Sequence, residues 1–306
     1  MDRQPVLIEK ILKLKKKRNA VILAHNYQLG EIQDIADFVG DSLDLSQSAA
    51  KTDAVVIVFC GVHFMAETAS ILCPDKTVLL PDEHAGCPMA NMITAPQLRA
   101  RRKEHPKATV VCYVNSAAAV KAESYICCTS ANAFGVVESL DTNEIIFVPD
   151  QYLGHYISTK TRKKMILWPG FCPTHARIMP EYIVKLRNEY PEAKVVVHPE
   201  CRPDVIALAD EVLSTSGMVR FAGREDVQEM IVGTEIGIIH RLKKENPGKR
   251  FIPISEQAVC PNMKLITLEK VLWSLEEMVP EVKVPEKIRL KAKAAVDRML
   301  AVGRKE

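Results

Sequence analysis

Three Cys-Pro dipeptides lie at nearly even intervals along the sequence. The chain has 306 residues and nine cysteines, and four of these cysteines are followed by proline: Cys73 and the evenly spaced set Cys87, Cys172 and Cys260. The members of this set follow predicted strands. They are 85 and 88 positions apart. A fixed period of this kind indicates repeated structural units. The spacing therefore predicts three related units.

Other stretches repeat at the same offsets. "EHPKATVVCYVNS" (104–116) aligns with "EYPEAKVVVHPEC" (189–201), and "NAVILAHNYQ" (19–28) takes the same place in the first third. Each apolar run ends in a polar cluster. The three clusters are His25-Asn26-Tyr27, Tyr113-Val114-Asn115 and His198-Pro199-Glu200.

Two further landmarks support a triplication. "VGDS", "CCTSAN" and "VLSTSG" place the hydroxyl residues Ser42, Ser130 and Thr215 near the start of a predicted helix. "KTVLLP", "KMILWP" and "KRFIPI" lead into the three Cys-Pro pairs as closing strands.

Short runs rich in Val and Ile alternate with helical patterns such as residues 31–40 and 180–190. This alternation indicates parallel sheets covered by helices on both faces. We predict an α/β fold of three pseudo-equivalent, three-layer αβα units around a central cavity. The expected units are 1–87, 88–172 and 173–260. The tail, 262–306, predicts two helices separated at Pro280 and Pro285, which we expect to pack on the first unit.

Composition excludes several classes of protein. The formal net charge is only +3, and the basic runs 13–18 and 99–103 contain no interleaved aromatic residues, so we expect exposed helix faces and no nucleic-acid partner. No run approaches the about 20 apolar residues that a membrane span needs. Residues 1–18 predict an amphipathic helix and not a signal peptide, which favours a reducing, cytoplasmic location for the cysteines.

The other six cysteines have simpler interpretations. Cys60, Cys112, Cys127 and Cys128 end or interrupt apolar runs and are predicted to be buried as small hydrophobic residues. Cys73 and Cys201 lie at element ends, and the sequence leaves them open. Cys87, Cys172 and Cys260 stand apart because all three precede proline and follow predicted strands.

Ligand sites of open parallel sheets lie beyond the carboxyl ends of the strands, so the three Cys-Pro turns and the three polar clusters should converge. Three thiolates at one point predict a metal site. His175 could complete a Cys3His zinc site. A [4Fe–4S] cluster on three cysteines would instead leave one iron open as a Lewis acid.

The remaining polar residues suggest what enters the cavity. Hydroxyls and backbone N–H groups at helix starts bind carboxylate or phosphate, although N-capping is their commoner use. His25, His198 and Glu200 are candidate proton carriers, and Tyr27 is a candidate acid–base phenol. The remaining histidines show no partner pattern and are predicted to be structural: His63, His84, His105, His155 and His240.

Several motifs resemble the quinolinate synthase family of the bacterial and archaeal NAD pathway. They run in order from about residue 20 to residue 275: "ILAHNYQLGEIQDIADFVGDSLDLS", "CPMANM", "YVNS", "CTSANA", "FCPTH", "VHPEC", "GTEIGIIHRL" and "AVCPNMK". The resemblance implies condensation of iminoaspartate with dihydroxyacetone phosphate to quinolinate, with loss of phosphate and water. It also implies a [4Fe–4S] cluster on Cys87, Cys172 and Cys260.

The resemblance assigns further site residues. Tyr27 and Glu200 would be the leading acid–base groups, with His25 and His198 beside them. The residues implied to bind substrate are His25, Ser42, Tyr113, Asn115, Ser130, His198, Glu200 and Thr215. Because iminoaspartate is unstable, a transient contact with L-aspartate oxidase is also expected. The Cys-x-x-Cys-x-x-Cys motif of some longer members is absent near Cys260.

Two alternatives remain open from the residues. One is another hydro-lyase that uses the same kind of cluster. The other is a non-catalytic protein with a structural zinc ion on Cys87, Cys172, Cys260 and His175.

Overall fold

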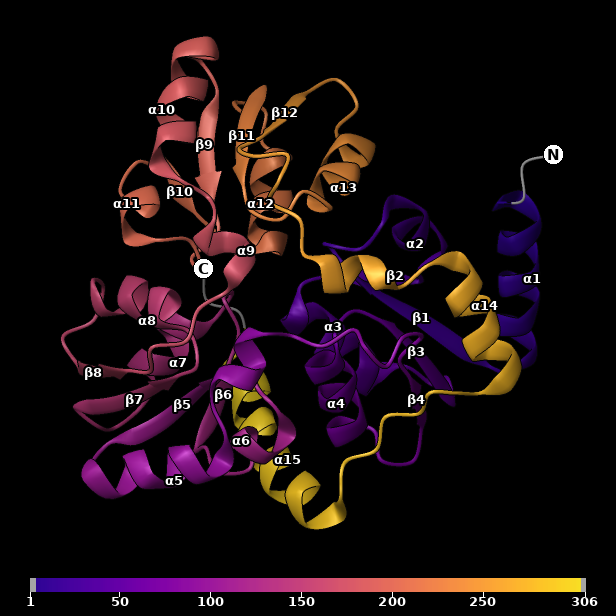
Figure 1. Cartoon of the computed structure of the whole chain (residues 1–306), viewed down its shortest axis with the longest axis horizontal. Coiled ribbons are helices and arrows are strands. Elements are labelled where there is room, and N and C mark those ends of the chain that lie inside the picture. Colours follow the sequence, from indigo (N-terminus) through magenta and orange to yellow (C-terminus); the bar gives the residue numbers. More distant parts are fainter. Residues whose placement is uncertain (1–3, 304–306) are drawn as a thin grey trace.

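Three parallel sheets of four strands each make up the molecule (Figure 1). The structure is a computed structural model that describes residues 4–303. The sheet orders are β2-β1-β3-β4, β6-β5-β7-β8 and β10-β9-β11-β12, so each sheet repeats the same connectivity. Helices flank each sheet. The α/β class and the three αβα units predicted from the sequence are confirmed.

The strands fall into three successive groups along the chain. They are β1 (Ala20–His25), β2 (Phe38–Gly40), β3 (Val56–Cys60), β4 (Thr77–Leu79), β5 (Thr109–Tyr113), β6 (Ile126–Cys128), β7 (Glu144–Val148), β8 (Lys164–Leu167), β9 (Lys194–Val197), β10 (Glu211–Val212), β11 (Glu229–Gly233) and β12 (Arg250–Pro253).

Helices connect these strands and form the tail. They are α1 (Gln4–Lys17), α2 (Gly30–Ile35), α3 (Ser42–Lys51), α4 (His63–Leu72), η1 (Met89–Met92), α5 (Ala95–Glu104), α6 (Ala118–Lys121), α7 (Ala133–Glu138), α8 (Gln151–Ser158), α9 (Pro173–Ala176), α10 (Pro180–Glu189), α11 (Pro203–Ile206), α12 (Thr215–Ala222), α13 (Ile238–Glu245), η2 (Pro261–Leu265), α14 (Leu268–Glu277) and α15 (Glu286–Val302).

The central strands are buried on both faces. All five residues of β3 are buried, as are the last four of β7. Parallel strands covered by helices read as continuous apolar runs for this reason. The predicted burial of Cys60, Cys112, Cys127 and Cys128 is confirmed, since each is 0% exposed. Cys73 and Cys201 are buried as well.

The helical prediction for residues 31–40 is wrong in its second half. Helix α2 ends at Ile35, and residues 38–40 form strand β2, which pairs in parallel with residues 23–25 of β1. Ile32, Ile35 and Val39 are spaced as on one face of a helix, so the period alone favoured a helix. Pairing with the edge of β1 takes precedence over that local pattern.

The tail forms two helices, as predicted, but they pack in different places. Helix α14 contacts α1 and β3 of the first unit, and Val282 N–H bonds to the Val78 carbonyl of β4. Helix α15 contacts α6 and β6 of the second unit and also α4 of the first (Figure 1). The expectation that the whole tail packs on the first unit is therefore wrong for α15.

Helix α1 confirms the helix expected near the start of the chain, although residues 1–3 of that prediction lie outside the described residues. Within residues 4–303, every helix is too short or too polar to cross a lipid bilayer.

Candidate active site and metal centre

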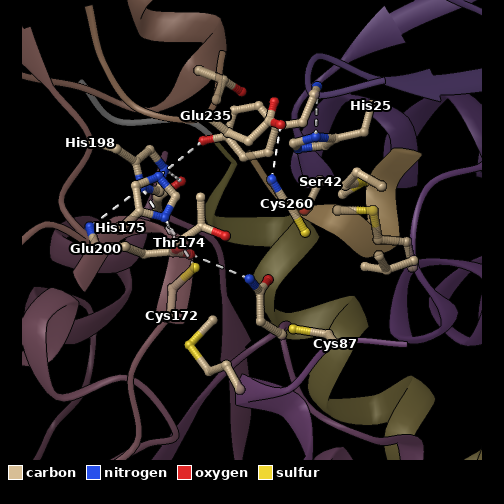
Figure 2. Close-up of a pocket in the computed structure, with 18 of the residues that line it drawn as sticks. His25, Ser42, Cys87, Cys172, Thr174, His175, His198, Glu200, Glu235 and Cys260 are labelled. Carbon is tan, nitrogen blue, oxygen red and sulfur yellow. Dashed lines mark hydrogen bonds and ion pairs between the residues drawn. The ribbon is translucent and has the colours of Figure 1, made fainter. Parts of the chain in front are cut away.

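One pocket is lined by residues of all three units (Figure 2). The carboxyl ends of strands and the turns that follow them supply its walls. It brings together all twelve residues selected from the sequence: His25, Tyr27, Ser42, Cys87, Tyr113, Asn115, Ser130, Cys172, His198, Glu200, Thr215 and Cys260.

Each of the three cysteines stands immediately before a short helical turn. Cys172 is the N-cap of α9 and Cys260 the N-cap of η2, each with proline in the first turn, and Cys87 precedes Pro88 at the start of η1. Proline suits the first position of a helix because its φ is already helical and it has no N–H to satisfy. In each Cys-Pro pair the proline therefore favours a helical turn directly after the cysteine that presents its thiol.

Burial opposes ionisation of these thiols. Burial, with a smaller contribution from the charges of Glu200 and Cys260, raises the pKa of Cys87 to about 12. Burial also raises the pKa of Cys172, to which Glu200 and Cys87 add, and that of Cys260. Backbone N–H groups of the following turns act in the opposite direction. Because the thiolate is the form that binds metal, the three thiols are suited to a site where a cation compensates their charge.

The spacing of potential ligands tests what such a site can hold. Over residues 4–303, one group of three or more ligand atoms lies within 4.8 Å of one another: Cys172, His175 and Glu200. These three could hold a metal ion. Two sulfurs on one zinc ion must lie within about 4.6 Å, since each Zn–S bond is about 2.3 Å long.

Cys87, Cys172 and Cys260 do not form such a group, so their arrangement does not fit the Cys3His zinc site considered above. A cluster binds each cysteine through a different iron, and its thiolates can lie farther apart. The three thiols line one pocket from three separate turns, and Figure 2 shows them around it.

Glu200 has several polar partners in the pocket. Its Oε1 accepts the Tyr113 hydroxyl at 2.5 Å and the Asn115 amide at 3.3 Å, and its Oε2 lies 2.8 Å from His175 Nδ1. Burial alone would raise the pKa of Glu200, but His175, His198 and the Tyr113 hydroxyl lower it to about 2. Glu200 is therefore a carboxylate at neutral pH.

Tyr27 has the opposite character. Burial raises the pKa of Tyr27 well above its usual range, and the charge of Glu200 adds to this shift, so the phenol keeps its proton. Its hydroxyl lies 2.5 Å from Thr234 Oγ1, which in turn lies 2.8 Å from His175 Nε2. A continuous chain of hydrogen bonds thus joins Tyr27 to Glu200.

His25 and His198 share one geometry. The Nδ1 of His25 accepts the N–H of Tyr27 at 3.2 Å, and the Nδ1 of His198 accepts the N–H of Glu200 at 3.3 Å. Burial lowers the pKa of each histidine to about 3. Both rings are therefore neutral at neutral pH and carry their proton on Nε2, and that of His198 lies 3.2 Å from Ser130 Oγ.

The hydroxyl residues do not serve as the N-caps. Ser42 is the first residue of α3 and Thr215 the first of α12, while the preceding Asp41 and Ser214 cap these helices. Ser130 lies before α7 and faces the same pocket. The simple capping interpretation is therefore wrong for Ser42 and Thr215.

Sequence reasoning missed several residues of the site. His175, considered only as a zinc ligand, bridges Cys172, Glu200 and Thr234, with its Nδ1 3.1 Å from the Cys172 sulfur. Glu235, also missed, lines the pocket. It stands 85 positions after Asp150, and the repeat offset was the signal that could have singled it out.

Comparison with known proteins agrees with this site. The family model described as Quinolinate synthetase A protein matches residues 9–301. A quinolinate synthase of Dehalococcoides mccartyi (strain CBDB1) is 66% identical over 297 residues, covering 97% of this chain and 98% of the relative. One of Methanosarcina barkeri (strain Fusaro / DSM 804) is 57% identical over 300 residues, covering 98% of this chain and 99% of the relative. The chain therefore belongs to the quinolinate synthetase A family, whose members are enzymes of NAD biosynthesis.

Proposed function

We propose that this protein is a quinolinate synthase that condenses iminoaspartate with dihydroxyacetone phosphate. Phosphate and water are lost, and pyridine-2,3-dicarboxylate (quinolinate) forms. One observation carries the proposal: three Cys-Pro turns from three units line the same pocket as Glu200 and Tyr27. Family membership supplies the reaction, and the pocket supplies groups able to perform it.

Cys87, Cys172 and Cys260 would hold a [4Fe–4S] cluster. When bound, a cluster on three cysteines supplies an open iron that acts as a Lewis acid toward a substrate oxygen. Loss of water from a hydroxyl-bearing substrate is the kind of step that benefits from such an acid. The poor fit to a single zinc ion favours the cluster over the zinc alternative.

Glu200 and Tyr27 divide the proton transfers between them. Glu200 is ionised and accepts a proton as general base, whereas Tyr27 keeps its proton and donates it as general acid. Pairs of groups whose surroundings push their pKa values apart are typical acid–base partners. Thr234 and His175 hold the two groups in one hydrogen-bonded chain.

Neutral donors would bind the anionic parts of the substrates. Among the lining residues that the structure describes, none is Lys or Arg. The N–H groups at the starts of α3 and α12 favour carboxylate or phosphate there. The side-chain donors assigned to the same task are His25, Ser42, Ser130, His198 and Thr215.

Tyr113 and Asn115 would contact the substrate near the thiols. The Oδ1 of Asn115 is buried and lacks a hydrogen-bond partner within the described residues. A substrate hydroxyl or amine could satisfy this oxygen.

The proposed setting follows from this chemistry. The substrates are small molecules, and the unstable imine would be received in the cytoplasm through transient contact with L-aspartate oxidase. Another cluster-dependent hydro-lyase is the alternative reaction, and the product distinguishes it.

The test is an anaerobic assay of the iron-reconstituted protein with iminoaspartate and dihydroxyacetone phosphate, followed by chromatography. Quinolinate formation, with one phosphate released per quinolinate, is the expected result. A protein that is purified anaerobically as a colourless zinc form, or that consumes neither substrate, would contradict the proposal.

A further inference from the structure

Glu235 occupies a position that recurs in all three units but differs among them. It is the second residue after the third strand of its unit, and the corresponding residues are Val62 after β3 and Asp150 after β7. Asp150 precedes Glu235 by 85 positions and follows Val62 by 88, the same offsets that separate the strand ends at His25, Tyr113 and His198. The three positions thus share their place after the third strand of each unit and differ in their side chain.

The Glu235 carboxylate is fully buried, and both of its oxygens have hydrogen-bond or ion-pair partners. It is 0% exposed. Its Oε1 accepts the backbone N–H of Cys260 at 3.0 Å and lies 2.9 Å from Lys264 Nζ, and its Oε2 accepts the N–H of Gly237 at 2.7 Å. A buried carboxylate is tolerated when it is paired and hydrogen-bonded in this way.

Lys264 extends the network into the first unit. Its ammonium group donates to the backbone carbonyl of Tyr27 at 2.5 Å. The phenol of the same tyrosine contacts Thr234, the residue before Glu235. The phenol of Tyr27 is therefore held by the segment that follows β11, and its carbonyl is held by Lys264 of η2, which pairs with Glu235.

Gly237 shows how closely these groups approach. A side chain at this position would place its Cβ 2.6 Å from the Tyr27 carbonyl oxygen, 2.7 Å from Lys264 Nζ and 2.8 Å from Glu235 Oε2. Only glycine fits without displacing one of the three.

The corresponding positions of the other units lack this network. Val62 has no polar side chain, and the neighbouring His63 N–H bonds to the Ala85 carbonyl instead. Asp150 caps α8 through the Leu153 N–H, and the backbone N–H of Cys172 also acts on its carboxyl group. Contact with a Cys-Pro turn is therefore shared by Asp150 and Glu235, and among the three equivalent positions it is Glu235 that pairs with a lysine reaching an acid–base residue of another unit.

We propose that Glu235 is a positioning residue that fixes the Cys260 turn and, through Lys264, the acid–base residue Tyr27. The inference rests on the proposed cluster, because it gives the Cys260 turn its purpose. Partners of metal ligands hold the ligand in place, and their loss typically lowers metal affinity about 10–100-fold. The charge of Glu235 also lies beside one thiolate, so it should influence the electronic state of the group bound there.

The experiment compares Glu235→Gln with Glu256→Gln, an exposed glutamate in the same unit. Both variants and the wild type are reconstituted with iron and sulfide, and iron release to a chelator is timed under anaerobic conditions. Glu235→Gln should lose iron about 10-fold faster or more than wild type, and Glu256→Gln should match wild type. The reduction potential of the bound cluster should rise only in Glu235→Gln, because removal of a nearby negative charge favours the reduced cluster.

Gly237→Ala provides the same test without a change of charge, should Glu235→Gln fail to fold. It should also speed iron release, because the added methyl group displaces Glu235 or Lys264. Equal iron retention and equal potential in Glu235→Gln and Glu256→Gln would overturn the inference alone. A wild-type chain that takes up no iron would overturn the proposed function and this inference together.

Discussion

The carboxyl ends of β1 and β9 carry the same histidine but a different residue two positions later. His25 and His198 are both buried, both have a pKa lowered to about 3 by burial, and both accept the backbone N–H of the second following residue. That second residue is Tyr27 in the first unit and Glu200 in the third.

This difference gives the first unit a proton donor and the third unit a proton acceptor at equivalent positions of the same backbone. Burial keeps Tyr27 protonated, while the histidines and the Tyr113 hydroxyl keep Glu200 ionised. A repeated backbone can thus place equivalent atoms around one pocket, and the side chains then take different tasks. The second unit has Asn115 at the corresponding position, which adds a neutral polar group.

The largest effect on activity is expected for Glu200→Gln. The variant removes the base and gives Tyr113 and Asn115 an amide in place of a carboxylate acceptor, so kcat should fall about 10³-fold or more. Steady-state assays of quinolinate formation measure this. Glu192→Gln, an exposed glutamate of the same unit, is the matched control and should retain wild-type kcat. A kcat of Glu200→Gln within threefold of the wild-type value would show that Glu200 is not the general base.

A smaller loss is expected for Tyr27→Phe. The ring stays in place but cannot donate a proton, so kcat should fall about 10²-fold. Because its pKa is raised, Tyr27 should cause no alkaline loss of wild-type activity below about pH 10. Tyr182→Phe, at an exposed tyrosine, is the control. Unchanged kcat in Tyr27→Phe would show that the first unit does not supply the acid.

The two histidines should make stability depend on pH to a similar extent. Their folded pKa of about 3 lies below the ordinary histidine pKa of 6.5, so the unfolded chain binds more protons between these values. The contribution of each neutral histidine to the free energy of unfolding is therefore fully present above about pH 6.5. It is lost as the pH decreases, by about 2 kcal/mol per histidine between pH 8 and pH 5.

Urea unfolding of the cluster-free protein at the two pH values measures this change. His25→Gln and His198→Gln should each reduce the pH dependence by about 2 kcal/mol, whereas the exposed control His84→Gln should not. Equal wild-type stability at pH 5 and pH 8 would contradict the shared geometry of the two strand ends.

Much of the fold could be predicted from the repeat, because strands, polar strand ends and Cys-Pro turns recur at fixed offsets. The pattern failed where local and long-range signals compete. Residues 38–40 continue a helical period, yet they form a strand because β1 offers them an edge. The sequence shows that helix α15 has an apolar face. It does not show which of the three units packs against that face.

The twelve predicted site residues share one pocket because strand ends meet at one edge of each sheet. Glu235 could have been found from the repeat offset, but Lys264 could not, because its importance comes from contacts with the Glu235 carboxylate and a backbone carbonyl. Such contacts leave no pattern in the residue types. His175 was recognisable only as a possible ligand, since its bridge from Thr234 to Glu200 joins residues far apart in the sequence.

The central claim is that three equivalent turns hold one cluster in the pocket where the acid and the base meet. Iron and sulfide counted per chain after anaerobic reconstitution, with the visible absorption of the same samples, test it most directly. Wild type and Cys127→Ser, which alters a buried strand cysteine, should each bind about four irons, and Cys87→Ser should bind no stable cluster. Equal iron in Cys87→Ser and Cys127→Ser would contradict the account.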